Sequence, residues 1–154
     1  MVYFRSLLSA LALATWLGAP LGTAAEAGTL YISVEDGVAI GGYDPVSFFV
    51  ANAPQEGHAD HALMWKGAVW LFVSAENRLR FEANPRAYAP RFGGHCAYGI
   101  ARGHVASGNP LQWQIVDGRL YLFHSPRAES RWDEARGALI HEAAEHWPQI
   151  MRDR

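Results

Sequence analysis

Two aromatic-rich segments, each divided by a two-residue turn, constrain the fold of this chain most strongly. In the second segment, Asp117-Gly118 separates residues 112–116 from residues 119–123. Asp-Gly favours the left-handed backbone of a type I′ turn, which joins two antiparallel strands. The same arrangement surrounds Lys66-Gly67, with strands expected over residues 63–65 and 68–73. The sequence therefore predicts two β-hairpins.

Helix signals lie between and after these hairpins. Asp44 and Ser74 are capping residues, and Asn84-Pro85 and Pro148 are stop signals. We expect helices that begin at 44–45 and that cover residues 75–83, 95–102, 127–134 and 138–147. The prediction is an α+β fold: two hairpins form a small antiparallel sheet interleaved with short helices, and helices end the chain. We detect no internal repeat and no linker.

The N-terminal segment has the pattern of a signal peptide. Arg5 precedes an apolar stretch over residues 7–17, which is too short to span a bilayer comfortably. Small residues then predict cleavage after Ala25 or Ala27. We therefore expect residues 1–27 to direct export, to a bacterial periplasm or out of the cell, and residues 28–154 to form one domain. The alternative is an uncleaved N-terminal anchor.

Composition excludes several classes of protein. The net charge of −2 provides no basic field for nucleic acid, and no later stretch is long and apolar enough to cross a membrane. Cys96 is the only cysteine, which excludes an internal disulfide and a zinc site made of several thiolates. We expect a metal ion or a periplasmic protein as the partner.

A series of short motifs is the most specific feature of the mature chain. The motifs are Gly42-Tyr43-Asp44-Pro45-Val46, Trp65-Lys66-Gly67 with Phe72, Ser74 with Phe81, Asn84-Pro85 with Tyr88, Gly93-Gly94-His95-Cys96-Ala97-Tyr98-Gly99, and Trp113 to Leu122. In this order and spacing they resemble the YHS domain family and, in their last part, its exported bacterial branch. The resemblance implies a small α+β domain related to treble-clef-like metal-binding modules. It also implies metal binding or sensing, because such domains often accompany copper and heavy-metal ATPases.

The chain departs from that family where the metal ligands are expected. The resemblance places Ser47, Val73 and Asn77 where metal-binding members carry cysteines. Valine cannot ligate a metal, and neutral serine and asparagine oxygens are poor ligands for soft ions. We therefore expect the thiolate site to be absent. If the correspondence is right, these three side chains come together near the first hairpin, with Val73 buried.

Cys96 is the candidate for a replacement site. We expect it at the start of a short helix, where helix amides stabilise a thiolate. A copper or zinc ion bound there would need imidazole ligands as well, for which His124 is the first choice, followed by His104 and His95. The alternative is that Cys96 is a buried apolar residue. A looser candidate for copper is His58, His61 and Met64, which can share an ion only if their segment is helical.

These observations lead to three hypotheses of function. The first is a non-catalytic, exported binding or accessory protein, with a copper-type metal as the candidate ligand. The second is a thiol-dependent redox protein or enzyme centred on Cys96. The third is a partner-binding module without a ligand. Motifs of the serine hydrolase, zinc protease and phosphate-binding loop classes do not occur in the sequence.

Overall fold

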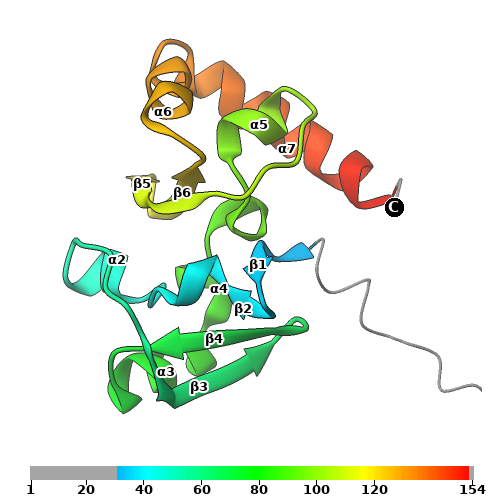
Figure 1. Cartoon of the computed structure of the whole chain (residues 1–154). Coiled ribbons are helices and arrows are strands. Elements are labelled where there is room, and N and C mark those ends of the chain that lie inside the picture. Colours follow the sequence, from blue (N-terminus) through cyan, green and yellow to red (C-terminus); the bar gives the residue numbers. More distant parts are fainter. Residues whose placement is uncertain (1–30, 153–154) are drawn as a thin grey trace, which may run out of the picture.

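The computed structural model describes residues 31–152, in which short strands and helices alternate along the chain (Figure 1). The first part contains β1 (Val34–Glu35), β2 (Val38–Ala39), η1 (Ile40–Gly42), α2 (Ser47–Val50), β3 (His58–Trp65), β4 (Ala68–Phe72), α3 (Ala75–Ala83) and α4 (Pro85–Tyr88). The second part contains η2 (Arg91–Gly94), α5 (Ala97–Ala101), β5 (Asn109–Val116), β6 (Arg119–Phe123), α6 (Pro126–Asp133) and α7 (Arg136–Arg152). The expected signal peptide, residues 1–27, lies outside the described residues.

The α+β class is confirmed, and so are both hairpins, β3–β4 and β5–β6. The expectation that the hairpins share one sheet is wrong. β3 and β4 belong to a sheet of order β1-β2-β4-β3, in which β2 runs parallel to β4, and β5–β6 is a separate two-stranded sheet. The short strand β2 occupies the open edge of β4, so the second hairpin cannot pair there.

The two hairpins are copies of one another, which corrects the expectation of no repeat. Adding 51 to both residue numbers of each β3–β4 pair gives a β5–β6 pair: Leu63↔Trp70 becomes Gln114↔Tyr121, for example. The register shift also recurs: it lies between His58 and Ala62 in the first hairpin and between Asn109 and Trp113 in the second. The hairpins therefore share one backbone design.

The correspondence extends on both sides of the hairpins. Ser74 and Ser125 cap the helices that follow, each by accepting a hydrogen bond from the third residue on. Before the hairpins, the left-handed turns at Ile40–Gly42 and 92–94 are equivalent. Each turn is followed by a matching isolated bridge, Tyr43↔Glu56 in the first half and His95↔Ser107 in the second. The described chain thus contains two copies of a turn–helix–hairpin–helix unit. We call residues 40–83 unit 1 and residues 92–133 unit 2.

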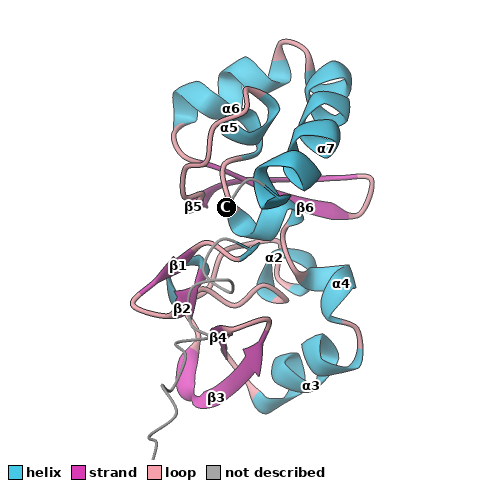
Figure 2. Ribbon diagram, turned by 90° about the vertical axis from the view of Figure 1, so that its right-hand side faces the viewer, coloured by secondary structure: helices cyan, strands magenta, loops and turns pink. Residues whose placement is uncertain are grey.

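Strand β6 links the two hydrophobic cores. Leu120 and Leu122 belong to the core of unit 1, whereas Tyr121 and Phe123, on the opposite face of the strand, belong to the core under α5, α6 and α7. Successive side chains of a strand point to opposite faces, so a strand buried on both faces joins both cores. In Figure 2 the β5–β6 hairpin accordingly lies between the helices of unit 2 and the whole of unit 1.

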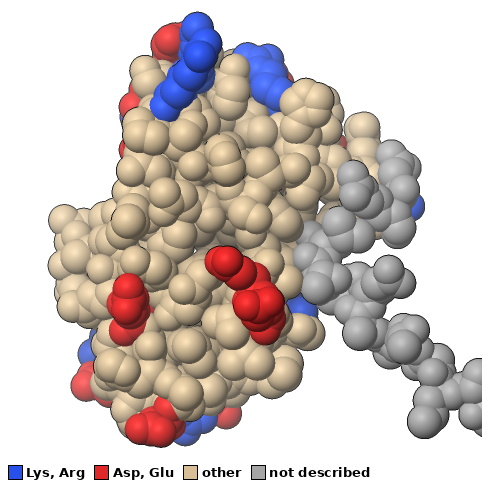
Figure 3. All heavy atoms as spheres, in the orientation of Figure 1, with Lys and Arg blue, Asp and Glu red and all other residues tan. Residues whose placement is uncertain are grey.

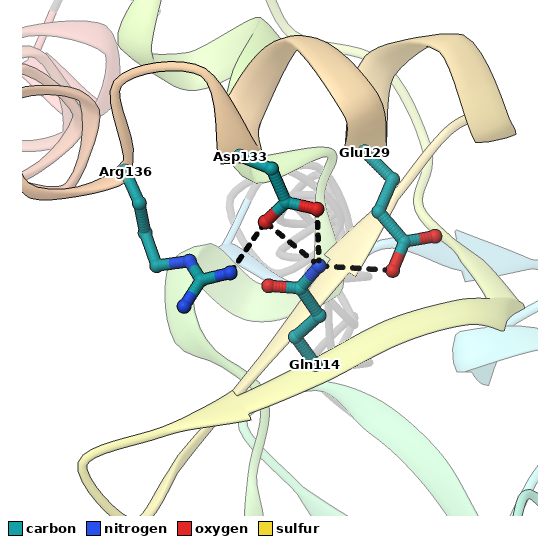
Figure 4. A network of polar contacts seen from close by, with 4 residues as sticks. All are labelled: Gln114, Glu129, Asp133 and Arg136. Atoms are coloured by element: carbon teal, nitrogen blue, oxygen red, sulfur yellow. Dashed lines mark hydrogen bonds and ion pairs between the residues drawn. The ribbon is translucent and has the colours of Figure 1, made fainter.

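Helix α6 is tied to strand β5 by a polar network (Figure 4). The side-chain amide of Gln114 donates to Glu129 at 3.0 Å and to Asp133 at 3.2 Å, and Arg136 contacts Asp133 at 2.5 Å. Hydrogen bonds from Arg136 and from Gln114 lower the pKa of Asp133, and the bond from Arg136 has the larger effect. The network sets the position of the Ser125-capped helix over the second hairpin.

Helix α7 continues beyond the expected stop. It runs from Arg136 to Arg152 and includes Pro148, whereas the sequence predicts an end at Trp147. Proline removes the hydrogen bond to the carbonyl four residues earlier, that of Ala144. Both residues are exposed, so water can satisfy that carbonyl and the helix continues. Within residues 31–152, no helix is both long and apolar enough to span a membrane.

Candidate functional site

A buried aspartate organises the centre of unit 1. Asp44 follows the left-handed turn of η1 and is fully buried. Its Oδ1 accepts a hydrogen bond from the backbone N–H of Val46 at 2.8 Å. Its Oδ2 accepts from the backbone N–H of Val73 at 3.0 Å and from Nδ2 of Asn77 at 2.7 Å. The carboxylate therefore connects the turn before α2, the end of β4 and the first turn of α3.

The three positions expected to have lost metal ligands all lie around this carboxylate, which confirms that they come together. Ser47 is fully buried, and its Oγ donates to the backbone oxygen of Asp44 at 2.8 Å and accepts from Gln55 at 3.1 Å. Asn77 is 7% exposed and donates to Asp44 directly. The expectation of a buried Val73 is wrong, because Val73 is half-buried and contributes its backbone N–H instead.

Sequence reasoning missed the central role of Asp44, to which it assigned only a helix cap. The helix begins later, at Ser47, because the Asp44 side chain holds the following residues in a turn. The residue types at positions 47 and 77 were the available signal. A serine and an asparagine that are buried near each other both require hydrogen-bond partners. Asp44 supplies the acceptor that both of them contact.

Cys96 occupies the equivalent position in unit 2. Asp44 and Cys96 each come two residues after a Gly-Gly pair that ends a turn. The backbone N–H of Asp44 donates to the backbone oxygen of Gln55, and that of Cys96 to the backbone oxygen of Ala106, each at 2.8 Å. Cys96 is 2% exposed and is the N-cap of α5, where its Sγ accepts from the N–H of Gly99 at 3.4 Å. Its expected place at a helix start is confirmed, and its thiol is buried.

The three histidines proposed to join Cys96 differ in exposure. His95 is 6% exposed, and its ring lies 5.7 Å from that of Trp147. His104 is exposed in the loop that follows α5. His124 is exposed, and its Nδ1 lies 3.0 Å from the backbone oxygen of Ser107. Because a carbonyl only accepts, Nδ1 carries the proton when the ring is neutral.

These residues do not form a metal centre with three ligands. Among residues 31–152 there is no group of three or more His, Cys, Asp or Glu side chains placed to hold one ion. The looser candidate also fails, because His58, His61 and Met64 lie on strand β3 rather than on a helix. The expected site of Cys96 with one or two of these histidines is smaller than such a group and stays a prediction.

Neither the distribution of charge on one face of the molecule nor comparison with known proteins identifies Asp44 or Cys96 as a binding site. The face seen in Figure 3 is mostly uncharged, with acidic side chains on its lower part and basic side chains at its upper edge. Comparison with protein-family models, with curated proteins and with solved structures finds no match for this chain.

Proposed function

We propose that this chain is an exported, non-catalytic binding or accessory protein of the YHS domain family, in which a hydrogen-bonded aspartate replaces the family's thiolate cluster. The arrangement around Asp44 carries the proposal. The positions that the resemblance assigns to lost ligands converge on this carboxylate, and three N–H groups occupy it. Hydrogen bonding of a buried carboxylate does the structural work that a metal does in such modules.

The absence of a catalytic function is supported by the surroundings of Cys96. A cysteine nucleophile needs access to its substrate and an adjacent base. The Cys96 side chain is buried at the N-cap of α5, and two of its three candidate partners, His104 and His124, are exposed. Asp44 is equally unsuited to catalysis, because its oxygens are occupied and it is fully buried. Both residues therefore fit a structural role.

A metal titration tests this proposal. We expect isothermal titration of the purified protein with Zn(II), and with Cu(I) under reducing conditions, to show no stoichiometric binding that depends on Cys96. The reason is that the described residues bring no three ligands together. Cys96→Ser is the matched control, because serine keeps the size and the acceptor of the N-cap. One equivalent of metal bound by the natural protein and lost in Cys96→Ser would contradict the proposal.

One observation favours the second candidate function, a thiol-dependent redox protein. The N–H of Gly99 donates to Sγ of Cys96, an interaction that stabilises a thiolate. Burial opposes this function. We expect iodoacetamide to alkylate Cys96 in the folded protein at least about tenfold more slowly than in 6 M urea, because reaction requires local opening. Mass spectrometry over time measures both rates, and equal rates would favour the thiol function.

A further inference from the structure

A cavity of about 420 Å³ lies where the turns of both hairpins meet helix α7. Its lining includes Trp65 and Lys66 at the end of the first hairpin, Arg119 at the turn of the second, and Trp147 of α7. The segment around η2 closes it from a further side. Cavities of this volume are typical of sites for small molecules. Neither Asp44 nor Cys96 lines it, so it is distinct from the centres of the two units.

The charge of this cavity is of one sign. Four of the chain's 13 basic residues line it, and none of its described lining residues is acidic: the four are Lys66, Arg86, Arg91 and Arg119. The ion pairs found among residues 31–152 involve other arginines. These four cations have no carboxylate partner among residues 31–152, so in a chain of net charge −2 they concentrate a positive potential at one place. A cavity with such a potential favours an anion.

Four aromatic residues also line the cavity: Tyr31, Trp65, Phe92 and Trp147. The Nζ of Lys66, the only lysine of the chain, lies 3.7 Å from the ring centroid of Tyr31 and 4.8 Å from that of Trp65. The ring of Trp147 packs edge-on against Tyr31 and Phe92, with centroids 6.2 and 6.0 Å apart. Cation–π contacts hold the ammonium group over the rings. A ligand in this cavity would therefore meet cations and aromatic faces together.

Two of the arginines that line the cavity come from different elements. Arg91 belongs to η2, and Arg119 is the first residue of β6. Burial, together with the negative charge of Asp117, raises the pKa of Tyr121, and the positive charges of Arg91 and Arg119 oppose that rise. Arg119 also donates to the backbone oxygen of Arg86 at 3.2 Å. This hydrogen bond restrains the Arg119 side chain, which lowers the entropic cost of binding an anionic group.

We propose that this cavity binds a small aromatic anion, a molecule in which a phosphate or carboxylate group is attached to a ring. The anionic group would be held by Arg91 and Arg119, and the ring would lie against Trp147 and Trp65. This proposal rests on the proposed function in that it gives a binding protein a class of ligand. The residues that would bind this ligand are different from Asp44 and Cys96, on which the proposed function depends. Metal binding through Cys96 would overturn the proposed function and leave this cavity unaffected.

Four probes separate the parts of the proposal. We expect phenyl phosphate or benzoate to bind in isothermal titration and to quench tryptophan fluorescence, because Trp65 and Trp147 line the cavity. Inorganic phosphate and phenol should each bind at least about tenfold more weakly, because phosphate lacks the aromatic ring and phenol lacks the anionic group. Comparison of phenyl phosphate with benzoate identifies the preferred anionic group. No binding of either aromatic anion, or equal affinity for inorganic phosphate, would overturn the proposal.

Variants locate the binding in the cavity. Arg91→Gln and Arg119→Gln should each weaken the better aromatic anion at least about tenfold, because each removes a charged hydrogen-bond donor. Arg127→Gln is the matched control, as it removes an exposed arginine that does not line this cavity. Circular dichroism verifies that each variant is folded. Loss of affinity equal to that of the control would contradict the assignment.

The single lysine provides a readout that needs no substitution. Reductive methylation with ¹³C-formaldehyde labels Lys66 and the N-terminal amine, and it preserves the positive charge of the lysine. We expect the NMR signal of dimethyl-Lys66 to move on addition of the aromatic anion that binds, while the N-terminal signal serves as the reference. Binding with an unchanged Lys66 signal would place the ligand elsewhere and overturn the proposal.

Discussion

Replacement of Asp44 by alanine is expected to destabilise the fold by about 3–5 kcal/mol. The substitution leaves three donors without their acceptor: the buried backbone N–H of Val46, the buried side-chain amide of Asn77 and the partly buried backbone N–H of Val73. Each unsatisfied buried donor costs about 1–3 kcal/mol. The free energy of unfolding, measured by urea denaturation with tryptophan fluorescence, tests this expectation.

A control and a second variant make the test of Asp44 specific. Asp60→Ala removes an exposed carboxylate on β3 and should change the free energy of unfolding by no more than about 0.5 kcal/mol. A double-mutant cycle with Asn77→Ala should show that the effects of Asp44→Ala and Asn77→Ala are not additive, because these side chains share one hydrogen bond. A loss below about 1 kcal/mol in Asp44→Ala would show that the carboxylate is not the centre of unit 1.

Local signals in the sequence predict the local structure well. The turns at Lys66-Gly67 and Asp117-Gly118 have the positive φ values that the hairpin prediction requires. Ser74 caps α3, and the predicted range of that helix is confirmed. Such features depend on a few neighbouring residues, so a sequence pattern is sufficient to find them. The period-2 spacing of Tyr121 and Phe123 likewise predicts a shared buried face, and both side chains are buried.

Long-range features could not be predicted in the same way. The parallel pairing of β2 with β4 brings together Val38 and Val69, which no local pattern relates. The repeat was hidden because equivalent positions carry different residue types: Asp44 corresponds to Cys96, and Asn77 to Ala128. The two units share their backbone hydrogen bonds, and these bonds are compatible with different types of side chain. Reasoning from side-chain motifs therefore found Cys96 but not the position it shares with Asp44.

The exchange of Asp44 for Cys96 also explains why the units differ in polarity. In unit 1 the carboxylate has a partner on α3, the amide of Asn77. In unit 2 the corresponding helix carries Ala128, and the thiol accepts one hydrogen bond within its own turn. A thiol behaves largely as a small apolar group, so it can be buried without the donors that a carboxylate needs. One backbone design therefore accommodates a polar centre in unit 1 and an apolar centre in unit 2.

The aromatic centres of the two units give the second large expected effect. In unit 1, Phe81 packs on Trp70 and Phe72 with ring centroids 5.1 and 5.2 Å apart. The residues 51 positions later form the same cluster, in which the ring of Trp132 lies 5.4 and 5.5 Å from those of Tyr121 and Phe123. Phe81 and Trp132 are both fully buried. Each ring thus fixes a capped helix to its hairpin.

We expect Phe81→Ala and Trp132→Ala each to lower the free energy of unfolding by about 3–5 kcal/mol, because a large buried ring is lost and a cavity remains. The midpoint of thermal unfolding should fall by roughly 10–20 °C in both variants. Differential scanning calorimetry should still show a single transition for each. The reason is that Leu120 and Leu122 of β6 belong to the core of unit 1 while Tyr121 belongs to that of unit 2, so neither core can open alone.

Leu79→Ala is the matched control for this pair. Leu79 lies on α3, two residues before Phe81, but its side chain is 56% exposed, so its removal should change stability by no more than about 0.5 kcal/mol. Two separate transitions in Trp132→Ala would show that the units fold independently despite sharing β6. A loss in only one of the two core variants would show that the equivalent clusters do not carry equivalent stability. A single transition with similar losses would establish that the repeated units form one cooperative structure through the strand that they share.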